Sequence, residues 1–104
     1  MSRRWNPVES VVLALLAAQP AYGYEIGQLL SESGFGEVKG GTLYPLLRRL
    51  EEAGYLRGEW RVSDDGPSRK YYEVTPAGLE ELTRRRALWL TLRQAVDEAL
   101  GVVT

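Results

Sequence analysis

The sequence predicts a mainly α-helical fold with one small β-hairpin. Apolar residues recur at helical spacing in the first half of the chain, two alternating stretches flank a turn signal, and a long segment without helix breakers follows. Three helices, a hairpin and a long helix are the elements of a winged helix-turn-helix with a C-terminal extension. We expect residues 6–75 to form the winged helix-turn-helix domain and residues 76–104 to form the C-terminal helix.

The first helix is predicted to begin beside Asn6, which can cap it. Pro7 suits the first helical position, and Glu9 can reach back to complete a capping box. The apolar residues at positions 8, 11, 12, 15 and 16 form one helical stripe, and Pro20 ends the helix.

The second helix is predicted over residues 22–33. Its apolar face carries Ile26, Leu29 and Leu30. The glycines at positions 34 and 36 end it, because glycine readily adopts the left-handed conformation found after helix C-termini.

The third helix is predicted over residues 40–53, with Gly54 after it, and is the candidate recognition helix. Four leucines at i, i+3, i+4 and i+7 spacing form its buried stripe: Leu43, Leu46, Leu47 and Leu50. The opposite face carries Gly41, Pro45 and Arg48, with Tyr44 and Arg49 on its flanks. We place Pro45 in the first turn, where backbone N–H groups have no acceptor within the helix, and therefore expect it to break no hydrogen bond.

Two strands are predicted after the third helix. In the first, residues 55–62, Leu56, Trp60 and Val62 share one face, and Arg57, Glu59 and Arg61 share the other. The sequence Asp-Asp-Gly-Pro at 64–67 signals a turn, and residues 68–75 return as the second strand. The wing is therefore expected over residues 63–70.

Basic residues without acidic neighbours gather on the two elements that a winged helix presents to DNA. The stretch 39–50 holds three cations and no acid, and the stretch 67–72 holds two more. A helix in the major groove uses its N-terminal turns for base edges and phosphates, and hydroxyl groups suit phosphate oxygens. An ordinary solvated helix face is the alternative interpretation of Arg48 and Arg49. The candidate DNA-binding residues are Lys39, Thr42, Tyr44, Pro45, Arg48, Arg49, Ser68, Arg69 and Lys70.

Three stretches, YGYEI (22–26), GTLYPLLRRLEEAGYL (41–56) and SRKYYEVTPAGLEEL (68–82), strongly resemble the PadR family of bacterial transcriptional regulators. The resemblance covers roughly residues 8–100. It implies a winged helix-turn-helix, a dimer joined through the C-terminal helix, and repression by operator binding. It also implies that Thr42, Tyr44 and Arg48 lie in the recognition helix and Arg69 and Lys70 in the wing. Many relatives have glycine where this chain has Pro67-Ser68, which predicts a stiffer wing tip.

The last helix, predicted from Thr75-Pro76 to about Leu100, carries more apolar surface than a single stripe requires. Leu82, Trp89 and Val96 are spaced by seven residues. This surplus favours a second copy of the chain as partner, with Leu82, Trp89, Leu92 and Val96 at the interface. The run of arginines at 84–86 is interpreted as a solvated face, with a supporting DNA contact as the alternative.

Trp89 has a second interpretation. Because the chain resembles small drug-sensing members of the family, Trp89 is a candidate for stacking on a small flat aromatic effector at the dimer centre. An ordinary tryptophan buried in the interface is the alternative.

The composition limits the chemistry. The chain has 104 residues, a net charge of −1, no cysteine and no histidine, which removes thiol nucleophiles, imidazole catalysis and nearly all zinc sites. The start Met1-Ser2-Arg3-Arg4-Trp5 lacks the apolar core of a signal peptide, and no apolar run approaches a membrane span. We expect a cytoplasmic homodimer that binds double-stranded DNA at a roughly palindromic operator, with no catalytic residue, metal or cofactor. A winged helix used only for protein contacts is the second hypothesis, and an enzyme is the third.

Overall fold

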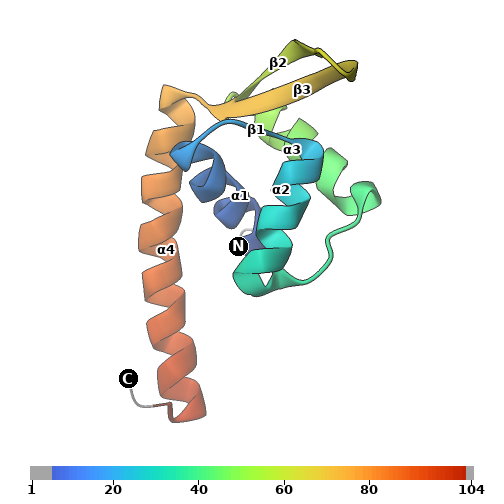
Figure 1. The fold of residues 1–104 in the computed structure, drawn as a ribbon. Helices are drawn as coiled ribbons and strands as arrows, with labels where there is room; N and C mark the ends of the chain where they lie inside the picture. Colours follow the sequence, from blue (N-terminus) through green and yellow to red (C-terminus); the bar gives the residue numbers. More distant parts are fainter. Residues whose placement is uncertain (1–5, 103–104) are drawn as a thin grey trace.

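The computed structural model describes residues 6–102 and shows a winged helix-turn-helix with a long C-terminal helix (Figure 1), which confirms the predicted fold class. Residues 1–5 lie outside the described residues, and so do residues 103–104, the end of the C-terminal segment predicted over 76–104. The helices are α1 (Pro7–Ala18), α2 (Gly23–Leu30), α3 (Gly40–Glu52) and α4 (Pro76–Leu100), and a π-helical turn, η1 (Ser31–Phe35), follows α2. The strands are β1 (Ala21–Tyr22), β2 (Leu56–Ser63) and β3 (Gly66–Val74).

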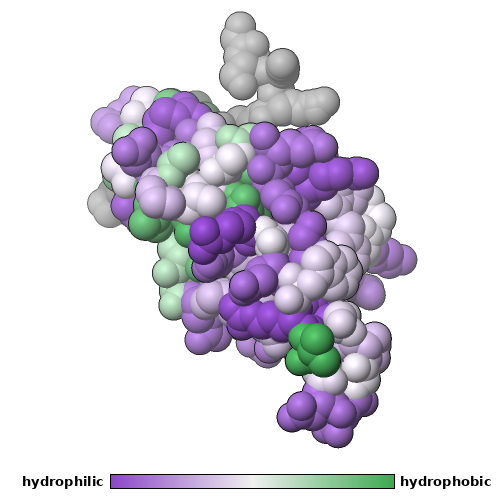
Figure 2. All heavy atoms as spheres, turned by 90° about the horizontal axis from the view of Figure 1, so that it is seen from above, coloured by the Kyte–Doolittle hydropathy of each residue, from purple (hydrophilic) through white to green (hydrophobic). Residues whose placement is uncertain are grey.

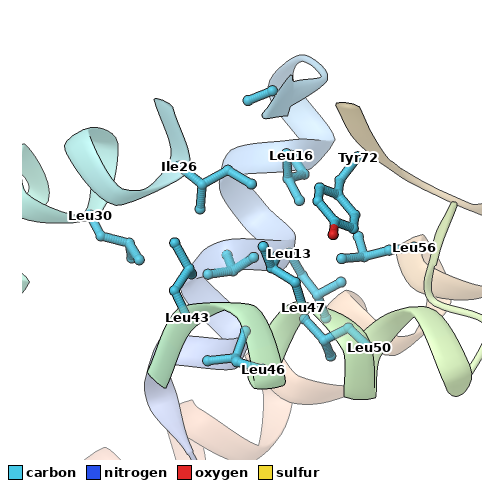
Figure 3. Close-up of a cluster of buried hydrophobic side chains, with 12 residues drawn as sticks. Leu13, Leu16, Ile26, Leu30, Leu43, Leu46, Leu47, Leu50, Leu56 and Tyr72 are labelled. Carbon is cyan, nitrogen blue, oxygen red and sulfur yellow. The ribbon is translucent and has the colours of Figure 1, made fainter. Parts of the chain in front are cut away.

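The core lies between the first three helices and the inner face of the sheet (Figure 3). All four leucines predicted to face inward from α3 are buried, and Ile26 and Leu30 of α2 lie opposite them. Leu56 and Tyr72 close the core on the side of the hairpin. The amphipathic pattern of α3 therefore predicted its core face correctly. That of α2 did so for Ile26 and Leu30, whereas Leu29 is only half-buried and lies outside the core cluster.

The helix α1 is buried on more of its surface than the sequence indicated. Val12, Leu13 and Leu16 are buried, although Leu13 lies outside the predicted stripe. The stripe residues at 8, 11 and 15 are partly buried instead. The reason is that α1 packs on two sides, against the core and against α4.

The sheet has three antiparallel strands in the order β1-β3-β2. The sequence predicts the hairpin β2–β3 but not β1, because a strand of two residues shows no periodicity. Ala21 pairs with Tyr72 and Tyr22 with Tyr71, so β1 joins the start of α2 to the middle of β3.

The ends of α1 and α2 differ in part from expectation. The Asn6 side chain caps α1 by accepting a hydrogen bond from the Val8 N–H (2.9 Å), as predicted. The Glu9 carboxylate binds Arg49 and Arg85 instead of completing a capping box. α2 ends at Leu30, earlier than predicted, because the backbone widens into the π-helical turn, which contains Gly34 (φ 98°).

The last helix begins and ends as predicted. The Thr75 hydroxyl accepts a hydrogen bond from the Gly78 N–H (3.0 Å), and Gly101 (φ 74°) follows the C-terminus of α4. Among the described residues, its N-terminal part packs on the other elements, and its C-terminal half extends away from them (Figure 1). The molecule is therefore elongated, with principal extents of 53 × 27 × 23 Å.

Candidate nucleic-acid interface

The outer face of α3 is the centre of the candidate interface. The helix begins after Lys39, whose carbonyl oxygen accepts hydrogen bonds from the Thr42 and Leu43 N–H groups. Because the four leucines hold the opposite face in the core, Gly41, Thr42 and Arg48 are exposed. The predicted orientation of this helix is confirmed.

The prediction that Pro45 lies in the first turn is wrong. The helix begins at Gly40, so Pro45 stands in its second turn. There its nitrogen would normally donate to the Gly41 carbonyl oxygen, four residues earlier, and proline has no N–H to donate. Gly41 is exposed, which leaves its carbonyl oxygen to solvent or to a ligand on the outer face.

Arg48 and Arg49 differ in their partners. Arg49 donates to the Glu9 carboxylate of α1 (3.1 Å), which turns its guanidinium back toward the body of the molecule. Within residues 6–102 neither Arg48 nor Lys39 has an ion-pair partner, and both are exposed. Arg48 in α3 and Lys39 at its N-cap are therefore available to an anionic ligand.

Tyr44 lies between α3 and the start of α2. Its ring covers Gly23, where an added Cβ would overlap the Tyr44 ring and hydroxyl, and the side chain remains 53% exposed. Burial raises the pKa of Tyr72, whose charged and phenolic neighbours are Lys70, Glu51 and Tyr44. Tyr44 thus forms part of a polar cluster on the side of α3 that faces the hairpin.

Lys70 belongs to the same cluster. Its ammonium donates to Glu51 of α3 (3.0 Å), and this hydrogen bond raises the pKa of Lys70. The aliphatic part of Lys70 covers Gly58 on the neighbouring strand. The structure therefore places Lys70 between the hairpin and α3 rather than on the open surface that the sequence suggested.

Arg69 lies on the other face of the hairpin. Its guanidinium stacks on the Tyr22 ring (4.6 Å to the centroid), and Arg61 stacks on Tyr71 (4.4 Å). The Tyr22 and Tyr71 rings meet edge to face with centroids 5.4 Å apart. Sequence reasoning missed the roles of Tyr22 and Arg61, because the register that pairs residues across strands cannot be read from alternation alone. It also missed Glu51 of α3, whose partner Lys70 lies 19 residues farther along the chain.

The turn of the hairpin is acidic. Asp64 and Asp65 occupy it, and Ser68 is exposed on the strand that follows. The cations of the wing therefore lie on the two strands and not in the turn itself. The acid-free stretch 67–72 did not indicate this position.

The apolar residues predicted for a dimer interface lie along α4. Leu82 is partly buried against the core, whereas Trp89, Leu92 and Val96 are each more than two-fifths exposed. A groove of about 620 Å³ runs between α1 and α4, with Val11, Leu15, Phe35, Leu82 and Trp89 among its lining residues. Apolar surface on this scale within one chain is typical of a protein interface.

The arginine run on α4 is mostly an ion-pair network rather than a free solvated face. Arg84 and Arg85 both donate to Glu81, which is buried, and Arg85 also binds Glu9 (3.2 Å). Hydrogen bonding from Arg84, followed by that from Arg85, lowers the pKa of Glu81 although burial opposes the shift. Because Arg49 binds the same Glu9, these pairs join α4, α1 and α3.

The described part of the chain, residues 6–102, contains no group of three or more acidic side chains placed to hold a metal ion. None of the helices described is long and apolar enough to span a membrane.

A recognition helix with an exposed cationic outer face, flanked by a hairpin wing, defines the class: a DNA-binding regulator of transcription. The Transcriptional regulator PadR-like family matches residues 12–84. The chain belongs to this family, whose members are transcriptional regulators, and it is therefore not an enzyme.

Individual relatives agree with this assignment. Transcriptional regulator Rv3488 of Mycobacterium tuberculosis is 46% identical over 90 residues, which cover 86% of this chain and 79% of the relative. The crystal structure of a PadR-like transcription factor from Bacteroides fragilis has a TM-score of 0.78 and 40% identity, with 89% of both chains covered. That of a PadR family regulator from Eggerthella lenta has a TM-score of 0.82 and 38% identity, covering 92% of this chain and 83% of that one.

Proposed function

We propose that this chain is a sequence-specific repressor that binds double-stranded DNA as a homodimer in the cytoplasm and is released by a small ligand or another signal. The observation that carries the proposal is the pair of exposed cations on α3 and at its N-cap: Arg48 and Lys39 have no ion-pair partner within residues 6–102. The opposite face of α3 is buried in the core, so the helix holds Arg48 in a fixed orientation. A cation held in this way suits an anionic ligand.

In this proposal α3, predicted as residues 40–53, enters the major groove. Arg48 binds a guanine edge or a phosphate, and Thr42 and Tyr44 donate hydroxyl groups to phosphate oxygens. Pro45 lets the outer face approach closely and leaves the Gly41 carbonyl oxygen as an acceptor. Arg49 has a secondary role, since it must first leave or share the Glu9 carboxylate.

The wing, residues 63–70, lies along the sugar–phosphate backbone in this proposal. Arg69 and Ser68 are exposed and make the first contacts. The guanidinium of Arg69 is held in place by the Tyr22 ring, so it loses little conformational freedom when it binds a phosphate. Lys70 contributes less, because its ammonium already neutralises Glu51.

We assign dimerisation to α4. This helix makes up most of the segment 76–104, which the sequence predicts to be separate from the DNA-binding domain 6–75. Trp89, Leu92 and Val96 are exposed on this helix, and the partly buried Leu82 lines the α1–α4 groove together with Trp89. A two-fold dimer presents two recognition helices to half-sites about 34 Å apart, which requires a roughly palindromic operator. A flat aromatic effector is proposed to bind next to Trp89 in the groove, where it would alter the packing of the two subunits.

The test is selection of bound duplexes from a random pool by the full chain, followed by titration of a selected duplex at several salt concentrations. We expect one enriched palindromic motif and an affinity that falls steeply with salt, by about 0.9 in log–log slope for each phosphate contact. If no duplex is enriched and no salt-dependent binding is found, the proposal is wrong, and the winged helix serves protein contacts only.

A further inference from the structure

Trp60 is the large aromatic side chain of the hairpin that the interface described above does not use. It is 67% exposed, and Val62, close to the turn, is 87% exposed. Trp60 lies four residues after Leu56 in β2, so the two side chains are on the same face of the sheet. Leu56 is in the core, whereas Trp60 lies past the edge of the core on this face. Seen from above, the surface is mostly hydrophilic with few strongly hydrophobic patches (Figure 2).

The position of Trp60 relative to α3 follows from its partner across the hairpin. Trp60 pairs with Lys70 in the antiparallel register, and directly opposed residues point to the same side of a sheet. The Lys70 ammonium binds Glu51 of α3 at 3.0 Å. Trp60 therefore lies on the side of the hairpin that faces α3, one step farther from the core than the Lys70–Glu51 contact.

The exposed face of α3 lies next to this side. Arg48 precedes Glu51 by three residues, and residues at this spacing are neighbours on a helix surface. The unpaired cation of the outer face and the exposed indole thus flank the same Lys70–Glu51 contact. Arg61 and Arg69 stand on the opposite face of the hairpin.

A duplex fits this combination. Its phosphates complement the cations on both sides, and its deoxyribose rings present carbon surface between the phosphates. We propose that Trp60 packs on the deoxyribose edge of the DNA strand that borders the groove entered by α3, an inference that rests on the proposed DNA binding. The contact adds affinity for every duplex, because the sugar edge is the same in every sequence.

The first experiment observes the indole directly. Protein labelled with 5-fluorotryptophan has three tryptophans, and the ¹⁹F resonance of Trp60 is identified by its loss in Trp60→Phe. We expect this resonance to shift when the wild-type chain binds a selected duplex, and to shift again with an unrelated duplex of equal length at low salt.

The second experiment separates an apolar contact from a charged one. Trp60→Ala is expected to lower the affinity for both duplexes about tenfold and to leave the slope of affinity against salt unchanged. Trp60→Phe, which keeps a flat apolar ring, is expected to recover most of the loss. Circular dichroism of each variant checks that the fold is intact.

Each outcome decides between the interpretations. If the duplex binds while the Trp60 resonance and the Trp60→Ala affinity stay unchanged, the sugar contact is wrong and DNA binding stands. If the resonance shifts with protein concentration and no duplex, a second copy covers Trp60, and the proposal is equally overturned. If the wild-type chain binds no duplex, the proposed function itself fails and this inference fails with it.

Discussion

Two neighbouring arginines show how single residues on one helix acquire different roles. Arg48 is exposed and has no ion-pair partner within residues 6–102, whereas Arg49 is bound to Glu9. We predict that Arg48→Ala weakens binding to a selected duplex by about 1–3 kcal/mol and changes the free energy of unfolding by less than about 0.5 kcal/mol. Fluorescence anisotropy measures the first quantity and urea denaturation the second.

Arg49→Ala is the matched control. It removes an ion pair that is half exposed on the arginine side, so we expect a loss of stability of at most about 1 kcal/mol and a smaller loss of DNA affinity than for Arg48→Ala. Equal losses of DNA affinity in the two variants would show that the Glu9 pair opens on binding and that both arginines face the DNA.

Gly23 and Gly78 are both closely covered, Gly23 by a side chain that can move and Gly78 by backbone that cannot. An alanine Cβ at Gly23 meets the exposed ring of Tyr44, whereas at Gly78 it meets the backbone carbonyl of Tyr55. We predict that Gly78→Ala destabilises the fold by about 2–3 kcal/mol, because backbone cannot move aside without repacking. Gly23→Ala is expected to change stability by less than about 1 kcal/mol and to lower DNA affinity by displacing Tyr44. Urea denaturation of both variants tests the contrast, and similar destabilisation by both would contradict it.

The sequence located the candidate site at the level of elements better than at the level of residues. The leucine spacing on α3 predicts which face is outward, because a helix has a fixed period. Which of the exposed cations has a partner depends on side chains far apart in the chain, such as Glu9 for Arg49 and Glu51 for Lys70. The strand β1 and the π-helical turn were missed because each is too short to show a period. Pro45 was misplaced although the start of the helix at Gly40 was predicted correctly, because the sixth residue of a helix lies beyond the first turn, where backbone N–H groups have acceptors within the helix.

At the scale of elements, Glu81 binds Arg85, the residue of α4 that forms an ion pair with Glu9 of α1. Arg84 and Arg85 hold the pKa of this carboxyl below its usual range, so its contribution to stability is full above the unfolded pKa of about 4.3 and is lost as the pH falls through the lower folded pKa. We predict that Glu81→Gln lowers the free energy of unfolding by about 1–2 kcal/mol at pH 7, because Arg85 is left partly buried with a weaker acceptor. The difference between wild type and variant should shrink as the pH falls below about 4. Chemical denaturation at pH 7, 5 and 3.5 measures it, and a difference that is independent of pH would show that the carboxylate charge is not involved.

At the scale of the whole molecule, the shape is elongated, and the C-terminal half of α4 is mostly exposed within residues 6–102. Trp89, Leu92 and Val96 stay exposed because α1, the helix beside α4, is already shared between the core and the first turns of α4. Burying a large apolar side chain contributes roughly 1.5–3 kcal/mol, so a surface that covers several of them is strongly favoured. A second copy is the partner that is always present, and two-fold symmetry would let each α4 fill the other chain's groove beside α1.

We therefore predict a homodimer at micromolar concentration, which light scattering would detect as twice the chain mass of 11.7 kDa. Leu92→Glu combined with Val96→Glu places two charges on the predicted interface and should give a folded monomer, since both residues are exposed in the single chain. The control is Leu90→Glu with Gln94→Glu, two charges that point about 160° away from Leu92 on the helix; it should remain dimeric. The monomeric variant should also bind an isolated half-site nearly as well as it binds the full palindrome, because only a dimer gains from the second half-site. A wild-type chain that is monomeric at this concentration would remove the dimer, the palindrome and the effector site at Trp89 together, while the single winged helix and its contacts through α3 would remain.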